Sequence, residues 1–330
     1  MRSYWRSSAK SRWSSARFQC VNSPARDAAS RVFRRPSDWP YARVPLKAGV
    51  PFVPAHTLVG EPTAPKLALL LHGALGSGSN LRGLATKLVK LRPEYRVCLV
   101  DLRHHGDSQG APPPNTLEAC ANDLSALTAQ LGQQPEVIAG HSFGGKTALM
   151  FARLFPGRVH QFWILDSNPG QQEPTAANEV IRVIQTVRQT TTPAADRAHV
   201  VTQLGDLGIS TGTANWLATN LQRSDAGFVW RFNLDAIYEL MLDYFRVDLW
   251  QVLEEPHAGS DFRVVVAEHS DRWAPENRAR LEAMLETVRL REPTARENGT
   301  VALHIVPNAG HWLHVDNPAF LLELMGRDLY

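Results

Sequence analysis

A serine between glycines stands where an apolar run gives way to helix-like sequence. Residues 137–145 read Val-Ile-Ala-Gly-His-Ser-Phe-Gly-Gly, so Ser142 is the centre of a G-x-S-x-G pentapeptide. A turn this tight from strand to helix excludes bulk two residues before and after the serine, and Gly140 and Gly144 meet that requirement. The serine would stand at a helix N-terminus, where the Phe143 N–H can stabilise an oxyanion. This pattern is typical of a nucleophilic serine.

The same stretch fits a second chemistry. Residues 140–147, GHSFGGKT, match the phosphate-binding pattern G-x-x-x-x-G-K-[ST] in full. In that interpretation Lys146 reaches phosphates and Thr147 holds a magnesium ion. The octapeptide alone therefore leaves two enzyme classes open, and residues elsewhere in the chain must decide between them.

Two other segments supply what a nucleophilic serine requires. The stretch His72-Gly73-Ala74 follows the first clear apolar run, and a turn there would place the Ala74 backbone N–H as a second oxyanion donor. His311 lies in a loop after the last apolar run, a setting that suits a general base. We discount His304, which falls inside that run, and His314. A phosphate-binding loop has no need of a second oxyanion donor, so serine chemistry is favoured.

The carboxylate that would orient His311 has two candidates. Asp271 lies in the loop after the penultimate apolar run, where Glu268 is the second choice, and Asp166 directly ends an earlier run. Both aspartates follow strand ends and precede His311, so either could accept a hydrogen bond from its Nδ1. We expect the other carboxylate to brace its loop or cap a helix by accepting backbone N–H groups.

The segment 101–108, Asp-Leu-Arg-His-His-Gly-Asp-Ser, is also dense in catalytic residue types. We expect it to shape a loop beside the site by hydrogen bonding rather than to take part in the chemistry. His104 and His105 together with His269 lack zinc-ligand spacing. No metal is therefore expected.

Short apolar runs that alternate with longer helix-like segments must position these residues. The segments 81–91, 116–131 and 145–155 have helical periodicity, and the apolar runs between such segments indicate buried parallel strands. The alternation predicts an α/β fold with a doubly wound, mostly parallel sheet, and functional groups at the C-terminal ends of its strands. The runs are Leu67–Leu71, Val97–Val100, Val137–Ala139, Phe162–Leu165, Phe262–Val266 and Val301–Val306.

The chain divides into four stretches. Residues 1–40 are predicted to be an organelle transit peptide, because residues 1–26 are rich in Arg and Ser and contain no acidic side chain. Import into a mitochondrion is the first expectation and a chloroplast the second, with a disordered cytosolic tail as the alternative. Residues 41–168 and 259–330 would form the core, with one or two edge strands before Pro65. Residues 169–258 lack a strand signal and are predicted to be a helical cap over the strand ends.

Composition narrows the class of protein. The 330 residues are 44% hydrophobic and 20% charged, enough for a large core, and the formal net charge of +3 does not indicate a nucleic-acid partner. Three cysteines lie far apart without a paired motif, which favours a reducing compartment. No apolar segment approaches the roughly 20 residues of a membrane span, so no transmembrane helix is expected. The oligomeric state has no sequence signal.

Four segments together resemble the α/β-hydrolase superfamily. They are HGALGS at 72–77, DLRHHGDS at 101–108, GHSFGGK at 140–146 and GHWLHV at 310–315. The elbow H-S-x-G-G-K and the final G-H-W-x-H resemble the esterase branch that contains the organellar α/β-hydrolase-domain protein eleven and its bacterial relatives. The stretches A-E-x-S-D-R-W and V-D-N-P look closer still to plant and algal members.

The resemblance implies hydrolysis of a carboxylic ester or related acyl bond, without a cofactor and under a helical cap. It also implies that Lys146 belongs to the elbow helix and that the strand-end Asp166 is a candidate acid, whereas Ser270 stands where many superfamily members have Asp. We therefore expect a small-molecule ester or acyl substrate. The alternatives are a P-loop nucleotide-binding protein and a hydrolase-fold protein that only binds a ligand. The expected catalytic groups are Ser142, His311, Asp271 or Asp166, and the N–H groups of Ala74 and Phe143.

Overall fold

The sheet is the frame of the molecule. The computed structural model describes residues 52–175, 178–289 and 299–330, so the transit-peptide prediction for residues 1–40 lies outside the described residues. Seven strands lie in the order β1-β3-β2-β4-β5-β8-β9, and all pair in parallel except β1, which runs antiparallel to β3. The strands are β1 (His56–Val59), β2 (Lys66–Leu71), β3 (Tyr95–Val100), β4 (Val137–His141), β5 (Gln161–Leu165), β8 (Asp261–Ala267) and β9 (Thr300–Val306).

The six apolar runs all form strands of this sheet, and β1 is the expected edge strand before Pro65. The central strands β2 and β4 are buried along almost their whole length, as a parallel sheet covered on both faces requires. The prediction of a doubly wound, mostly parallel α/β sheet is thereby confirmed.

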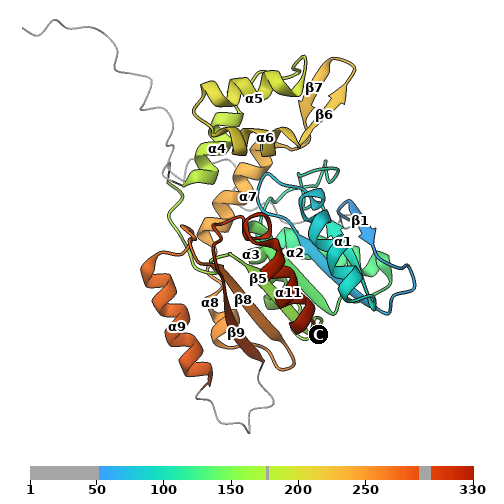
Figure 1. The fold of residues 1–330 in the computed structure, drawn as a ribbon, viewed down its shortest axis with the longest axis vertical. Helices are drawn as coiled ribbons and strands as arrows, with labels where there is room; N and C mark the ends of the chain where they lie inside the picture. The colour runs from blue at the N-terminus through green and yellow to red at the C-terminus, as the bar shows by residue number, and fades with distance from the viewer. Residues whose placement is uncertain (1–51, 176–177, 290–298) are drawn as a thin grey trace, which may run out of the picture. The chain divides into compact units, whose positions relative to one another are not determined.

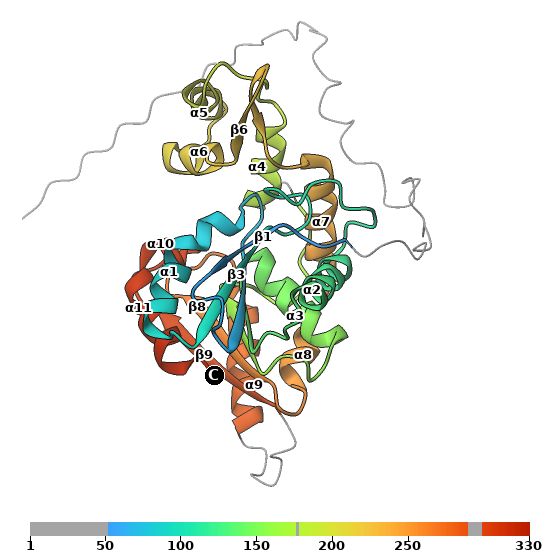
Figure 2. The same ribbon diagram turned by 90° about the vertical axis from the view of Figure 1, so that its right-hand side faces the viewer.

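Helices cover both faces of the sheet (Figure 2). On one face α1 (Arg82–Leu91) and α11 (Pro318–Asp328) pack on a cluster that includes Leu70, Val97 and Trp163. The other face carries a second cluster, to which α2 (Leu117–Leu131), α3 (Phe143–Leu154), α8 (Trp250–Glu254) and α9 (Pro275–Arg289) contribute. Two short elements, the 3₁₀ helix η2 (Gly78–Leu81) and α10 (Leu313–Asp316), follow strand ends.

Most of the segment between β5 and β8 lies beyond one end of the sheet, at the top of Figure 1, whereas its last helix, α8, packs beside the sheet. It holds α4 (Glu179–Val187), α5 (Arg197–Asp206), α6 (Thr211–Ala218) and α7 (Leu234–Arg246), together with a hairpin of β6 (Leu221–Ser224) and β7 (Gly227–Trp230). The prediction that this segment contains no strands was wrong, because the hairpin lies within it. Each hairpin strand has only four residues, too few to show an alternating pattern. The predicted cap, residues 169–258, also ends too late, because it includes α8; we refer to residues 169–249 as the cap.

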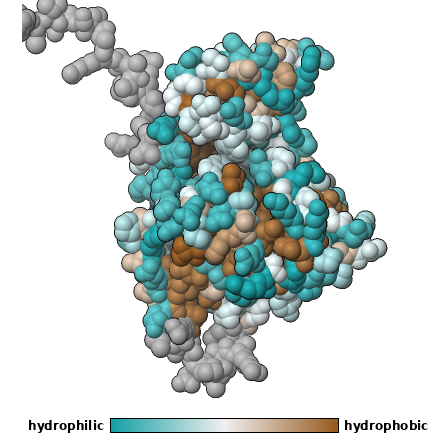
Figure 3. Space-filling view, in the orientation of Figure 1, coloured by the Kyte–Doolittle hydropathy of each residue, from teal (hydrophilic) through white to brown (hydrophobic). Residues whose placement is uncertain are grey.

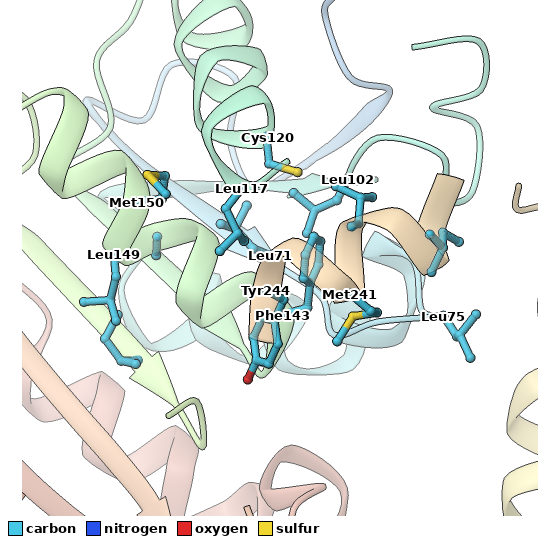
Figure 4. Packing of buried hydrophobic residues seen from close by; sticks show 14 of the residues in the cluster. Leu71, Leu75, Leu102, Leu117, Cys120, Phe143, Leu149, Met150, Met241 and Tyr244 are labelled. Atoms are coloured by element: carbon cyan, nitrogen blue, oxygen red, sulfur yellow. The ribbon is translucent and has the colours of Figure 1, made fainter. Parts of the chain in front are cut away.

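The cap packs on the C-terminal ends of the central strands. Figure 4 shows Met241 and Tyr244 of α7 close to Phe143 of α3 and to Leu71 at the end of β2. All four side chains belong to one buried cluster. Residues that follow the parallel strands are therefore gathered under the cap. Within residues 52–175, 178–289 and 299–330, no helix is long and apolar enough to cross a bilayer.

Candidate active site

Ser142 occupies a sharp turn between β4 and α3. Its φ of 52° and ψ of −115° lie in a region that residues with a side chain rarely adopt. Neighbouring backbone bonds hold this conformation: the Ser142 N–H donates to the Leu165 carbonyl at 2.9 Å, and the Gly145 and Lys146 N–H groups donate to the Ser142 carbonyl. Backbone strain of this kind persists only where the surrounding structure enforces it, and it is frequent at functional sites.

The two outer glycines of the pentapeptide are required by close backbone approach. A Cβ on Gly140 would lie 2.1 Å from the Gly144 carbonyl oxygen, and a Cβ on Gly144 would lie 2.6 Å from the Leu71 carbonyl oxygen. Both distances are far inside van der Waals contact. The elbow therefore tolerates no side chain at either position.

His311 faces a buried carboxylate. It lies in the loop after β9, and its Nδ1 donates to Oδ2 of Asp166 at 2.7 Å. The Asp166 side chain is fully buried, its Oδ2 also accepts the Ser270 hydroxyl at 2.7 Å, and its Oδ1 accepts the Ala267 N–H at 3.1 Å. Because Nδ1 carries the proton shared with the carboxylate, Nε2 is left as the hydrogen-bond acceptor of the ring.

Asp271 is placed differently. Its side chain is 71% exposed, and its Oδ1 lies 3.1 Å from Nε of Arg272. Glu268, the second choice in that loop, accepts the Asn308 N–H at 2.8 Å and so braces the loop that leads to His311. Of the carboxylates considered from the sequence, the structure brings Asp166 to the His311 ring.

Ser142, His311 and Ala74 line one pocket of about 600 Å³ between the cap and the strand ends. The cap contributes apolar side chains to its wall, among them Val183, Trp216, Met241 and Phe245. Phe143 begins α3 directly after Ser142, so its N–H belongs to the first turn of that helix. Figure 3 shows apolar surface, in brown, where the cap meets the core. A cavity of this size is typical of small-molecule sites.

The family described as "alpha/beta hydrolase fold" matches residues 68–254, more than half of the chain. The chain belongs to the α/β-hydrolase family. Mouse sn-1-specific diacylglycerol lipase ABHD11 is 31% identical to it over 273 residues, which cover 81% of this chain and 81% of the mouse protein. Esterase YbfF of Escherichia coli is 25% identical over 266 residues, which cover 79% of this chain and 92% of that protein.

A solved structure supports the same assignment of the fold. The structure described as "Marine microorganism esterase" superposes with a TM-score of 0.69 at 24% identity, and the match covers 84% of this chain and all of that one. The α/β-hydrolase prediction made from four sequence segments is therefore confirmed.

The P-loop interpretation does not fit this α/β-hydrolase. Nζ of Lys146 donates to the Gly170 and Tyr244 carbonyls, at 2.8 and 2.6 Å, and the Thr147 hydroxyl donates to the Phe143 carbonyl at 2.9 Å. Both side chains are fully buried. In a phosphate-binding loop they would face a ligand. The octapeptide match is a consequence of the elbow and its helix.

Two buried histidines of this α/β-hydrolase hold the loop that carries Ala74. Nε2 of His72 accepts the Leu102 N–H at 3.0 Å, and Nε2 of His105 accepts the Leu75 N–H at 3.1 Å, while the other nitrogen of each ring donates to a backbone carbonyl. Burial lowers the pKa of His72 to about 4 and that of His105 to about 3. Both rings are therefore neutral near pH 7 and can accept a bond.

The segment 101–108 has the loop-shaping role expected of it. The Asp101 carboxylate accepts the N–H groups of Gly78 and Asp107, and the Ser108 hydroxyl donates to the Asp101 carbonyl. Arg103 forms two bonds, of 2.7 and 2.8 Å, with the carboxylate of Asp123 in the interior. These contacts fix the chain beside the Ala74 loop.

His141 was not singled out from the sequence. Its Nε2 donates to the His311 carbonyl at 2.8 Å, and its ring lies 4.7 Å from the His311 ring, centroid to centroid. Burial lowers its pKa well below the usual value, so the ring is neutral. His141 therefore fixes the backbone of His311. Its position within the pentapeptide, one residue before Ser142, is the only sequence signal that could have suggested this.

Proposed function

We propose that this protein hydrolyses a carboxylic ester or related acyl bond through an acyl-enzyme on Ser142. The observation that carries the proposal is the 2.7 Å bond from His311 Nδ1 to the buried Asp166, in a pocket that Ser142 also lines. This bond leaves Nε2 to act as the base, in a ring that lines the pocket. The relatives named as an esterase and a lipase support the same chemistry.

In the proposed reaction the Ser142 Oγ attacks the carbonyl carbon of the ester while Nε2 of His311 takes its proton. The N–H groups of Ala74 and Phe143 hold the negative oxygen of the tetrahedral intermediate. His311 then gives the proton to the leaving alcohol, and the acyl group stays on Ser142. Attack by water, activated by the same imidazole, releases the acid and restores the serine.

Asp166 is the proposed orienting acid. Its carboxylate contacts Nδ1 of His311 and is buried, so it can fix the tautomer and stabilise the imidazolium that forms during attack. We expect Asp166→Asn to lower kcat by about 10⁴-fold. Asp271→Asn is the matched control, because this side chain is exposed and pairs with Arg272. If Asp271→Asn caused the larger loss, the assignment of Asp166 would be wrong.

The substrate is proposed to carry an apolar acyl chain. The cap side of the pocket includes the apolar side chains Val183, Trp216, Met241 and Phe245, and burial of each methylene group against such side chains contributes about 0.8 kcal/mol. The mouse relative's name, a diacylglycerol lipase, is consistent with such a chain. A series of p-nitrophenyl esters should therefore show kcat/KM rising with acyl length beyond acetate, and a flat series would contradict the proposal.

Labelling by a fluorophosphonate probe tests the nucleophile directly. Wild-type protein should be labelled and should hydrolyse p-nitrophenyl esters, and Ser142→Ala should do neither. Labelling retained in Ser142→Ala would refute the assignment of the nucleophile. A wild-type protein that is neither labelled nor active would favour the alternative of a ligand-binding protein with this fold.

We also propose that residues 1–40 direct import into a mitochondrion, on the grounds of their Arg and Ser content and the lack of acidic residues before Asp27. Residues 1–45 fused to a fluorescent protein should then co-localise with a mitochondrial marker. Chloroplast fluorescence would support the alternative organelle, and a diffuse cytosolic signal would refute import.

A further inference from the structure

Lys146 is a buried cation that the proposed reaction does not use. It lies four residues after Ser142 in α3 and is fully buried. Transfer of an ammonium group from water to a protein interior is costly unless hydrogen bonds compensate for the lost hydration. Burial lowers the pKa of Lys146 to about 7, although the carboxylates of Asp248 and Asp243 act in the opposite direction. The contacts of the Lys146 side chain should therefore explain why this group is buried.

Those contacts join α3 to both connections of the cap. Nζ donates to the carbonyl of Gly170, in the chain that leaves β5 for the cap, and to the carbonyl of Tyr244, near the end of α7, where the chain returns. Nζ also lies 4.7 Å from the centroid of the Tyr244 ring, within the range of a cation–π contact. One side chain thus bonds two segments that are far apart in sequence.

The two connections are also bonded to each other. The Gln172 N–H donates to the Phe245 carbonyl at 2.8 Å, and the Leu249 N–H donates to the Pro169 carbonyl at 2.9 Å. We call residues 169–172 and 244–249 the cap root. Because its two halves are paired, a displacement of one half carries the other with it.

The cap root forms part of the pocket wall. Gln171, Gln172, Tyr244 and Phe245 line the cavity that holds Ser142. The Tyr244 ring also lies 6.1 Å from the ring of Phe143, whose N–H is the proposed oxyanion donor, and Figure 4 shows the two side chains together. The position of the cap root relative to α3 therefore determines the space above the nucleophile.

We propose that Lys146 is a positioning residue that fixes the cap root to the helix behind Ser142 and thereby sets the fit of the pocket for long acyl chains. The proposal rests on the ester hydrolysis proposed above. Hydrolysis of an acetyl ester requires only Ser142, the pair of His311 and Asp166, and the oxyanion donors. A longer chain also requires the wall to which Tyr244 and Phe245 contribute. Loss of the lysine leaves two buried carbonyls without their donor, so the root is expected to shift.

The test compares Lys146→Met with Thr147→Val in the full chain. Thr147 is equally buried, but its hydroxyl bonds within α3 and has no bond to the cap root. The measured quantities are kcat and KM for p-nitrophenyl acetate and p-nitrophenyl octanoate. We expect Lys146→Met to lower kcat/KM for octanoate by about tenfold to a hundredfold, mainly through KM, because misplacement of binding groups by about 1 Å has effects of this size. Acetate hydrolysis should stay within about threefold, and Thr147→Val should preserve the ratio of the two substrates.

An unchanged octanoate-to-acetate ratio of kcat/KM, whether both activities fall equally or neither falls, would overturn the proposal. Lys146→Gln, which keeps an uncharged NH2 donor on a shorter side chain, should give an intermediate ratio and replaces the methionine variant if that variant does not fold. Hydrogen exchange of the wild type adds an independent test: the Gln172 and Leu249 amides should be protected as well as those of α3, and rapid exchange would refute a fixed root. A wild type inactive on both esters would instead refute the proposed function.

Discussion

Acidification should destabilise the folded protein by charging His72. Burial lowers the pKa of this imidazole from 6.5 to about 4, and its Nε2 accepts the Leu102 N–H, a bond that protonation would remove. The unfolded chain therefore takes up this proton more readily than the folded one. The contribution of His72 to stability is complete above about pH 6.5 and is lost as the pH falls toward 4. The difference between the ordinary pKa of 6.5 and the folded-state pKa of about 4 corresponds to about 3 kcal/mol in the free energy of unfolding. About 2 kcal/mol of this is lost between pH 7 and pH 5.

The free energy of unfolding can be measured by urea titration at both pH values for the wild type, His72→Gln and His199→Gln. Glutamine offers an amide oxygen to the Leu102 N–H and does not titrate, so His72→Gln should lose about 2 kcal/mol less than the wild type on acidification. His199 is exposed on α5, and its variant controls for the removal of a histidine. If the wild type and His72→Gln lost the same stability, His72 would not be a buried neutral group.

Three further variants test contacts around the pocket. Gly140→Ala places a Cβ 2.1 Å from the Gly144 carbonyl oxygen, so the elbow must shift, and the rate of fluorophosphonate labelling should fall even if the protein remains folded on circular dichroism. Arg103→Met leaves the buried Asp123 carboxylate without its partner and should cost about 3–5 kcal/mol in urea unfolding, and a loss below about 1 kcal/mol would contradict this. Glu179→Gln removes the ion pair between α4 and Arg272, which is partly exposed, and should change stability by less than about 1 kcal/mol.

The sheet and the elbow could be predicted because their signals are local. Strands buried on both faces must be continuously apolar, so the runs at 67–71 and 162–165 indicate their own structure. The elbow needs glycines at fixed offsets from Ser142, and those offsets are visible in the sequence. The hairpin β6–β7 has no comparable signal, because its strands are half exposed and four residues long.

The acid could not be chosen from the sequence, because Asp166 and Asp271 follow β5 and β8, neighbours in the sheet. Parallel neighbours bring their C-terminal ends to the same edge, so both carboxylates reach the vicinity of His311. What separates them is the direction of each side chain. Asp166 has a φ of 45°, and its carboxylate is held inward by the Ala267 N–H and the Ser270 hydroxyl, whereas the Asp271 side chain is exposed to solvent. No pattern in the sequence indicates that Asp166, rather than another aspartate, adopts this backbone conformation.

Among the histidines, too, the surroundings of the side chain and not the residue type determine the chemical role. His72, His105, His141 and His311 all lie near the strand ends, and residue type alone makes each a candidate base. His72, His105 and His141 are fully buried, and burial lowers the pKa of each ring. Their ring nitrogens form hydrogen bonds with backbone groups, so each is a neutral side chain that holds a loop in place. His311 differs because its Nδ1–H donates a hydrogen bond to a buried carboxylate while the ring borders the pocket. A base for Ser142 needs one nitrogen anchored and the other open to substrate, and in this set His311 has that arrangement.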